Sequence, residues 1–126
     1  MNIKAKFIEV RDNYVINQVK KAPLPQFKSI EIRRYRLVFS GRVQNVGFRL
    51  EISEMAKRLG LTGFCENLEN GDVFAEVQGQ FEKIKFLVAF MRSLKRIVVK
   101  HVEIKRLPLD FTETGFHSDE DDESCK

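Results

Sequence analysis

The sequence lacks several features that mark common classes of protein. Its 126 residues include no tryptophan, only two cysteines and two histidines, and no run of about 18 apolar residues of the kind that spans a membrane. Two cysteines are too few for a disulfide framework, and His101 and His117 do not have the spacing of metal ligands. The first 11 residues alternate apolar and charged side chains, unlike a secretory signal. We therefore expect a cytoplasmic protein with no membrane segment, metal or other cofactor.

What the sequence does contain favours one packed domain with a basic surface. Hydrophobic residues make up 43% of the chain, including 11 phenylalanines. The net charge of +4 includes −5 from Asp119–Glu123 and +1 from Lys126, so residues 1–118 carry +8. A basic globule suits anionic ligands, either small phosphates or nucleic acid, although a solvated basic surface is the simpler interpretation.

The composition divides the chain into three regions: an N-terminal arm at 1–33, a regular domain at 34–118 and an acidic tail at 119–126. The arm has two short apolar patches, Ile8–Val10 and Tyr14–Val19, separated by a possible turn at residues 11–13. These patches predict extra strands that pair with an edge of the sheet; the alternative is a flexible arm. Residues 20–26 read as a linker, because their prolines oppose regular structure.

The domain shows six elements by periodicity and turn signals. A helix with one apolar face follows the first strand and ends before Gly60, and the Asn70-Gly71 pair predicts a hairpin. The predicted order is strand, helix, strand, strand, helix, strand, over Arg34–Ser40, Phe48–Leu59, Leu61–Glu66, Asp72–Val77, Gln80–Lys95 and Val98–Arg106, with a possible further strand at Thr114–Ser118. This order indicates an α+β fold, the ferredoxin-like split β-α-β sandwich with two helices on one sheet face.

The loop Gly41–Arg49 joins the first strand to the first helix of this domain. Unpaired amides at a helix start attract anions, and the two glycines let the backbone bend around one. Arg49, in the first helical turn, adds a positive charge and a fork of donors. The loop is therefore a candidate phosphate site; the alternative is an ordinary turn followed by a solvated arginine.

Topology brings a second residue, Asn67, near this loop. A right-handed crossover makes the first two strands parallel, so their carboxyl ends lie at one edge of the sheet. With the third strand between them, the two ends are about 10 Å apart, enough for a phosphoryl group and a water. The Asn67 carboxamide could orient that water, or it could bond its own hairpin backbone instead.

Two motifs in these segments resemble the acylphosphatase signatures. Residues 41–49, GRVQNVGFR, resemble G-x-V-Q-G-V-x-F-R, and residues 63–79 resemble G-[FYW]-[AVC]-x-N-x3-G-x-V-x5-G. The resemblance implies hydrolysis of acyl phosphates to a carboxylate and inorganic phosphate without metal, by a small protein that we expect to be a monomer. Arg49 would grip the phosphoryl oxygens and Asn67 would orient the water. The cradle would be formed by backbone amides of Val43, Gln44, Asn45 and Val46.

Two departures from the family pattern bear on turnover. Asn45 stands where the family has glycine, a tolerable replacement if the backbone there has positive φ. Glu66 precedes Asn67, but strand alternation should point it to the opposite face. The alternative function is a non-catalytic anion-binding or regulatory module. RNA binding ranks last, because Asp72–Val77 lacks the aromatic, glycine-rich signature of RNA-recognition strands.

Overall fold

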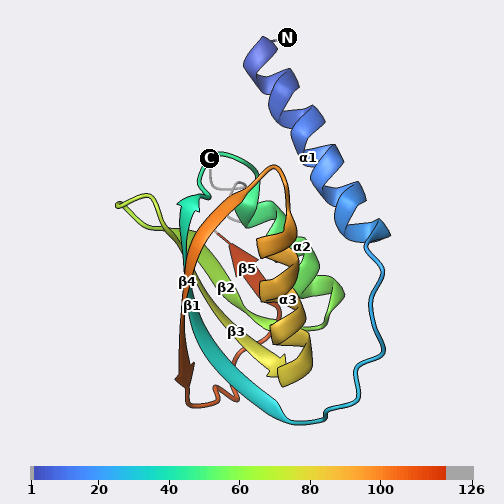
Figure 1. Ribbon diagram of the computed structural model, residues 1–126, viewed down its shortest axis with the longest axis vertical. Coiled ribbons are helices and arrows are strands. Elements are labelled where there is room, and N and C mark those ends of the chain that lie inside the picture. The colour runs from blue at the N-terminus through green and yellow to red at the C-terminus, as the bar shows by residue number, and fades with distance from the viewer. Residues whose placement is uncertain (1, 119–126) are drawn as a thin grey trace.

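A computed structural model describes residues 2–118, so the predicted acidic tail at 119–126 lies outside the described residues. The chain forms three helices and five strands within this range (Figure 1). In chain order they are α1 (Ile3–Lys21), β1 (Ile32–Arg42), α2 (Phe48–Arg58), β2 (Thr62–Asn67), β3 (Val73–Gln80), α3 (Phe81–Ser93), β4 (Val98–Leu107) and β5 (Phe116–Ser118).

The strands form one sheet in the order β4-β1-β3-β2-β5. Strand β3 pairs antiparallel with both β1 and β2, so β1 and β2 run parallel to each other with β3 between them. Strand β4 pairs antiparallel with β1, and β5 pairs parallel with β2. This is the split β-α-β arrangement predicted from the sequence, and the ferredoxin-like α+β fold class is confirmed.

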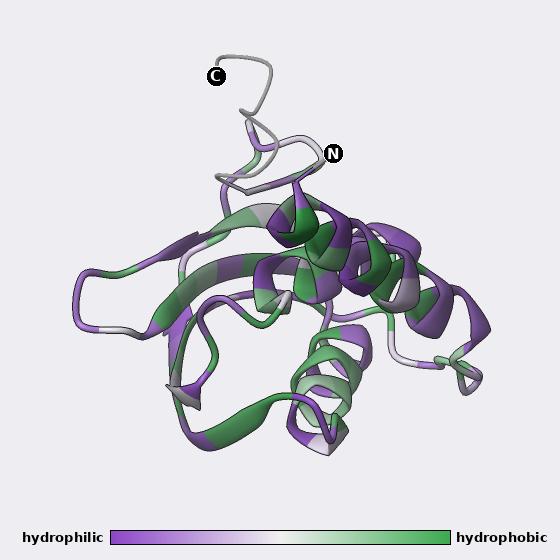
Figure 2. Cartoon of the chain, turned by 90° about the horizontal axis from the view of Figure 1, so that it is seen from above, coloured by the Kyte–Doolittle hydropathy of each residue, from purple (hydrophilic) through white to green (hydrophobic). Residues whose placement is uncertain are grey.

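Helices α2 and α3 cover the same face of the sheet, as expected (Figure 1). Alternate residues of β1 and β3 point to that face and are buried, among them Leu37, Phe39 and Val77. They pack against apolar residues of the two helices in a single core that includes Ile52, Met55, Leu87 and Met91. Figure 2 shows that apolar and polar residues are interspersed along the strands and helices that enclose this core.

Residues 108–115 carry the chain from the β4 edge of the sheet to the β5 edge. Arg34 of β1, only 4% exposed, donates to Glu113 of this segment at 2.6 Å and to Glu76 of β3 at 2.7 Å. Gln78 and Asp110 exchange hydrogen bonds at 2.8 and 3.0 Å. These contacts hold the segment in place, so that the short strand β5 can pair with β2.

The N-terminal arm is a helix, so the prediction of strands in it was wrong. Residues 11–13, interpreted as a turn, lie inside α1. Val15 and Val19 are both buried and stand one helical turn apart, on the face that meets α2. The edge strand expected from the arm is supplied instead by β5.

The side chain of Asn2 caps the start of this helix. The side chain of Asn2 accepts from the Lys4 amide at 2.8 Å at the start, and the helix continues through Lys21 into the predicted linker.

Within residues 2–118, no helix has the length and apolar character to cross a bilayer.

Candidate active site

The loop between β1 and α2 has the backbone geometry of a tight cradle. Gly47 adopts a left-handed conformation at φ 83°, and Asn45 is the one non-glycine residue between 2 and 118 with positive φ, at 62°. Asparagine tolerates this region better than other non-glycine residues. The backbone at residue 45 therefore has the positive φ under which asparagine is a tolerable replacement for glycine.

A cavity of about 170 Å³ lies where this loop faces the end of β2. It is far smaller than the roughly 300–1,000 Å³ of sites for drug-sized ligands. Its lining brings Arg49 and Asn67 together, as the topology predicted, although β3 separates their strands. The other lining residues are Ile8, Arg11, Val43, Asn45, Gly47 and Phe48.

Asn67 lines this cavity and carries an unsatisfied acceptor. Its Oδ1 atom is buried and has no hydrogen-bond partner in the structure. The alternative interpretation, a side chain that bonds its own hairpin, describes Asn70 instead, whose Oδ1 accepts from the Asp72 amide at 3.0 Å. Glu66 is exposed while Cys65 is buried, so the strand alternation points Glu66 away from Asn67, as expected. A buried acceptor without a partner is costly unless a ligand or water completes it.

Gln44 ties the cradle to the β2–β3 hairpin. Its Nε2 donates to the Leu68 carbonyl at 2.7 Å and to the Asp72 carbonyl at 2.9 Å. Gln44 was a candidate phosphate-binding residue through its backbone amide, and its side chain has this separate role. By joining the two loops, it sets the spacing between Arg49 and Asn67.

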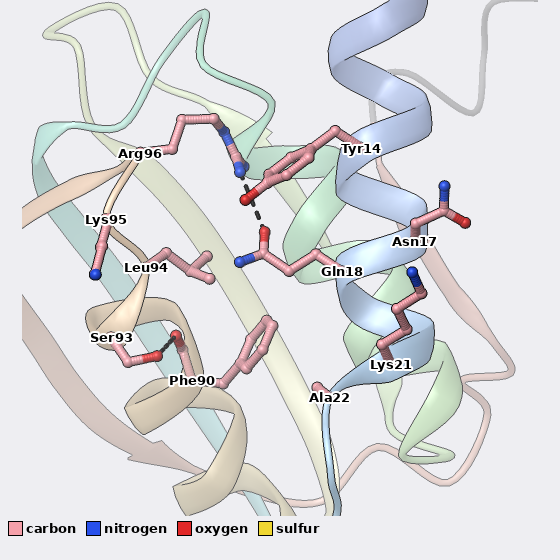
Figure 3. A pocket seen from close by; sticks show the side chains of 10 residues that line it. All are labelled: Tyr14, Asn17, Gln18, Lys21, Ala22, Phe90, Ser93, Leu94, Lys95 and Arg96. Carbon is pink, nitrogen blue, oxygen red and sulfur yellow. Dashed lines mark hydrogen bonds between the residues drawn. The ribbon is translucent and has the colours of Figure 1, made fainter.

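Arg96, in the connection between α3 and β4, supports the other side of the cradle. Its guanidinium donates to the Val46 carbonyl at 2.9 Å, to Glu51 Oε1 at 2.7 Å and to Gln18 Oε1 of α1 at 3.3 Å. The last contact borders a groove of about 670 Å³ between α1 and the end of α3 (Figure 3). Arg96 therefore connects the loop, α2 and α1. No sequence motif indicated this role, because its partners are distant in the chain.

Glu51 is fully buried in the first turn of α2, and burial raises its pKa. The hydrogen bond and charge of Arg96 act in the opposite direction and lower that pKa. The carboxylate Oε2 atom is buried without a hydrogen-bond partner. The ion pair thus sits in a weakly solvated region directly behind the cradle.

The electrostatics of the cavity favour an anion. The first hydrogen bond inside α2 runs from the Glu51 amide to the Gly47 carbonyl at 3.0 Å, so earlier amides have no acceptor within the helix. Two arginines, Arg49 and Arg11, line the same cavity. Among residues 2–118, no three histidine, cysteine or acidic side chains are grouped to hold a metal ion. The geometry therefore suits a small anion such as a phosphoryl group.

Comparison with known proteins identifies the family of this domain. The family model described as acylphosphatase matches residues 35–118. The chain belongs to the acylphosphatase family. Over 80 residues it is 39% identical to an acylphosphatase of Clostridium beijerinckii, covering 60% of this chain and 86% of the relative. It is also 44% identical over 70 residues to the Pseudomonas paraeruginosa acylphosphatase, covering 55% and 77% of the two chains.

Solved acylphosphatase structures share the fold. The structure from Coxiella burnetii superposes with a TM-score of 0.64 at 26% identity, covering 69% of this chain and 92% of that chain. The Bacillus subtilis acylphosphatase has the same TM-score at 22% identity, covering 70% and 98%. The family match begins at residue 35, so helix α1 lies outside it. Ile8 and Arg11 are thus cavity residues from outside the family domain, and the sequence patterns did not identify them.

Proposed function

We propose that this acylphosphatase uses Arg49 and Asn67 to hydrolyse the carboxyl-phosphate bond of small acyl phosphates. One observation carries the proposal: Arg49 and Asn67 line the same small cavity, and the Oδ1 atom of Asn67 is buried without a hydrogen-bond partner. A carboxamide acceptor suits an attacking water, and a guanidinium fork suits phosphoryl oxygens. Hydrolysis needs both an oriented water and a bound phosphoryl group.

The reaction needs few protein groups. The water oxygen attacks phosphorus, the bond from phosphorus to the acyl oxygen breaks, and the carboxylate leaves with the electron pair. Because a carboxylate is a good leaving group, no general acid is required, and a phosphoryl oxygen can accept the proton of the water. Positioning by Asn67 and charge stabilisation by Arg49 then supply the catalysis.

The backbone amides of Val43, Gln44, Asn45 and Val46 are proposed as the remaining phosphate donors. Val43 and Asn45 line the cavity, and the turn at Asn45 curves the backbone around it. The side-chain contacts of Gln44 and the Arg96 contact to the Val46 carbonyl hold this curve before substrate arrives. A cradle fixed in advance avoids reorganisation during the reaction.

Turnover of acetyl phosphate by purified protein tests this proposal. Arg49→Ala and Asn67→Ala should each lower kcat/KM by on the order of 100-fold or more, the usual cost of losing one preorganised stabilising group. Arg36→Ala removes an arginine from the opposite face of the sheet and should change kcat/KM less than about twofold. Wild-type turnover no faster than that of both site variants would exclude catalysis and leave the anion-binding module.

We also propose that the enzyme acts as a monomer in the cytoplasm. Cys65 is a buried cysteine, and two cysteines in the whole sequence are too few for a disulfide framework, which fits a reducing compartment. Sedimentation at working concentration should give a mass near 14.7 kDa, and a stable dimer would contradict the first part.

A further inference from the structure

We propose that Arg11 of helix α1 is a substrate-binding residue that adds a second guanidinium to the phosphoryl site. This inference rests on the proposed function and assigns to the N-terminal arm a part in the same site. Arg11 lines the same cavity as Arg49 and Asn67. Its side chain is only 27% exposed although it belongs to a helix at the surface of the domain.

The helix is anchored so that Arg11 is held at the cavity. Val15, one turn after Arg11, is fully buried, and Val19 is 2% exposed. At the end of the helix, Arg58 of α2 donates to the carbonyl groups of Val19 and Ala22. These contacts fix both the rotation of α1 about its axis and its position along that axis, which together direct Arg11 toward the cradle.

Helix α1 and the cradle are closely packed at Gly47. A Cβ atom added to Gly47 would lie 3.3 Å from the Arg11 Nε atom and 3.3 Å from a methyl group of Val15. A larger side chain would therefore press on both residues. Glycine at this position permits positive φ and also leaves room for the Arg11 side chain beside the loop.

The charge around Arg11 is only partly neutralised. Its Nε and Nη2 atoms donate to one oxygen of Asp12, at 3.1 and 2.9 Å. The Nη1 atom makes neither of these bonds, and it is the atom that we assign to a phosphoryl oxygen. Asp12 orients the guanidinium and at the same time weakens its field at the cavity. This arrangement suits a phosphoryl dianion, which presents more oxygens than Arg49 alone can bond.

Inorganic phosphate, the product of the reaction, is the probe for this inference. Arg11→Gln should raise its inhibition constant against acetyl phosphate about tenfold and lower kcat/KM by a similar factor, because one charge-assisted contact is lost. Asp12→Asn should act in the opposite direction and lower the inhibition constant a few-fold. Arg11→Lys should recover only part of the loss, since a single ammonium cannot replace the fork.

Lys6→Gln is the matched control, since it removes one positive charge from the same helix at a side chain that is 58% exposed. An inhibition constant for Arg11→Gln equal to that of the wild type, or to that of Lys6→Gln, would overturn the inference. Amide hydrogen exchange over residues 3–21 shows whether α1 stays docked in each variant, which separates loss of contact from loss of the helix.

The test also separates this inference from the proposed function. If the wild type does not hydrolyse acetyl phosphate, the affinity for phosphate can be measured from amide chemical shifts of residues 43–49. A tenfold weaker affinity in Arg11→Gln would then support the Arg11 contact without catalysis. Normal turnover combined with an unchanged phosphate affinity in that variant would reject the contact and leave the enzymatic function intact.

Discussion

At residue 45 the backbone turns with φ of 62°, in the middle of the phosphate cradle. Most side chains resist this conformation because Cβ approaches the following carbonyl oxygen, at a cost of about 1–2 kcal/mol. Asparagine reduces that cost, and glycine avoids it. Asn45 is therefore compatible with the positive φ of this loop, and it also lines the cavity.

Substitutions at this residue separate backbone shape from side-chain chemistry. Asn45→Gly should keep the free energy of unfolding within about 1 kcal/mol of the wild type and retain turnover, because the loop shape is kept. Asn45→Ala should destabilise the protein by about 1 kcal/mol and reduce kcat, because alanine resists positive φ. Urea unfolding together with acetyl phosphate hydrolysis measures both. An alanine variant that matched the glycine variant in both assays would contradict this account.

Helix α1 is the element that distinguishes this chain from the family domain. It docks through Val15 and Val19, while several of its large apolar residues, including Phe7 at 70% exposed, do not contact the core. The attachment of α1 therefore depends on a small apolar contact, on the cap from Arg58 and on the hydrogen bond from Arg96 to Gln18. The carbonyl groups at the end of a helix lack intrahelical partners, and Arg58 supplies donors for two of the residues there.

Removing this cap should loosen the helix without unfolding the sheet. In Arg58→Ala, amides of residues 3–21 should exchange at least tenfold faster, because hydrogen bonds from a charged donor contribute about 1.5–3 kcal/mol. Protection of β1 and β3 should stay close to that of the wild type. Arg92→Ala, a change of the same kind in the last turn of α3, is the control and should not affect α1. Equal exchange in the two variants would show that the cap does not hold the helix.

At the scale of the whole molecule, Arg96 links three parts of the chain that are far apart in the sequence. This one side chain contacts α1, the loop and α2 from the connection before β4. Its partner Glu51 has a pKa raised above its ordinary value of 4.5 by burial, so the folded state favours the protonated form. Stability from this group is therefore present at low pH and is lost as pH rises through the folded-state pKa. Arg96 limits that loss, since its charge stabilises the carboxylate.

Arg96→Ala should therefore destabilise the protein more at high pH than at low pH. We expect a loss of about 3 kcal/mol at pH 8, because without Arg96 the carboxylate form of Glu51 is buried and unpaired. Near pH 4 the loss should be about 1 kcal/mol, because the raised pKa of Glu51 favours its protonated form and mainly neutral hydrogen bonds are missing. Urea unfolding at both values measures this difference. In a Glu51→Gln background the destabilisation caused by Arg96→Ala should no longer depend on pH. If it still did, the pH dependence would come from another titratable group.

The sequence alone predicted the order of the elements in the domain and the meeting of Arg49 and Asn67 at one cavity. The two signatures lie in single segments, and the hydrophobic periods of the strands and helices are local properties that can be read along the chain. The parallel direction of β1 and β2, on either side of β3, followed from the handedness of the crossover, which brought Arg49 and Asn67 to one edge of the sheet. The sequence raised a positive φ at Asn45 only as a condition, and the structure shows that this condition holds.

Only the tertiary structure decided what lies around that site. The patches at residues 8–10 and 14–19 are compatible with strands or with a helix, and burial of Val15 and Val19 against α2 selects the helix. The roles of Arg11 and Arg96 depend on partners that are far away in the sequence, with no motif to relate them. Local patterns determine the elements and the cradle, whereas long-range packing determines which distant charges surround the cradle.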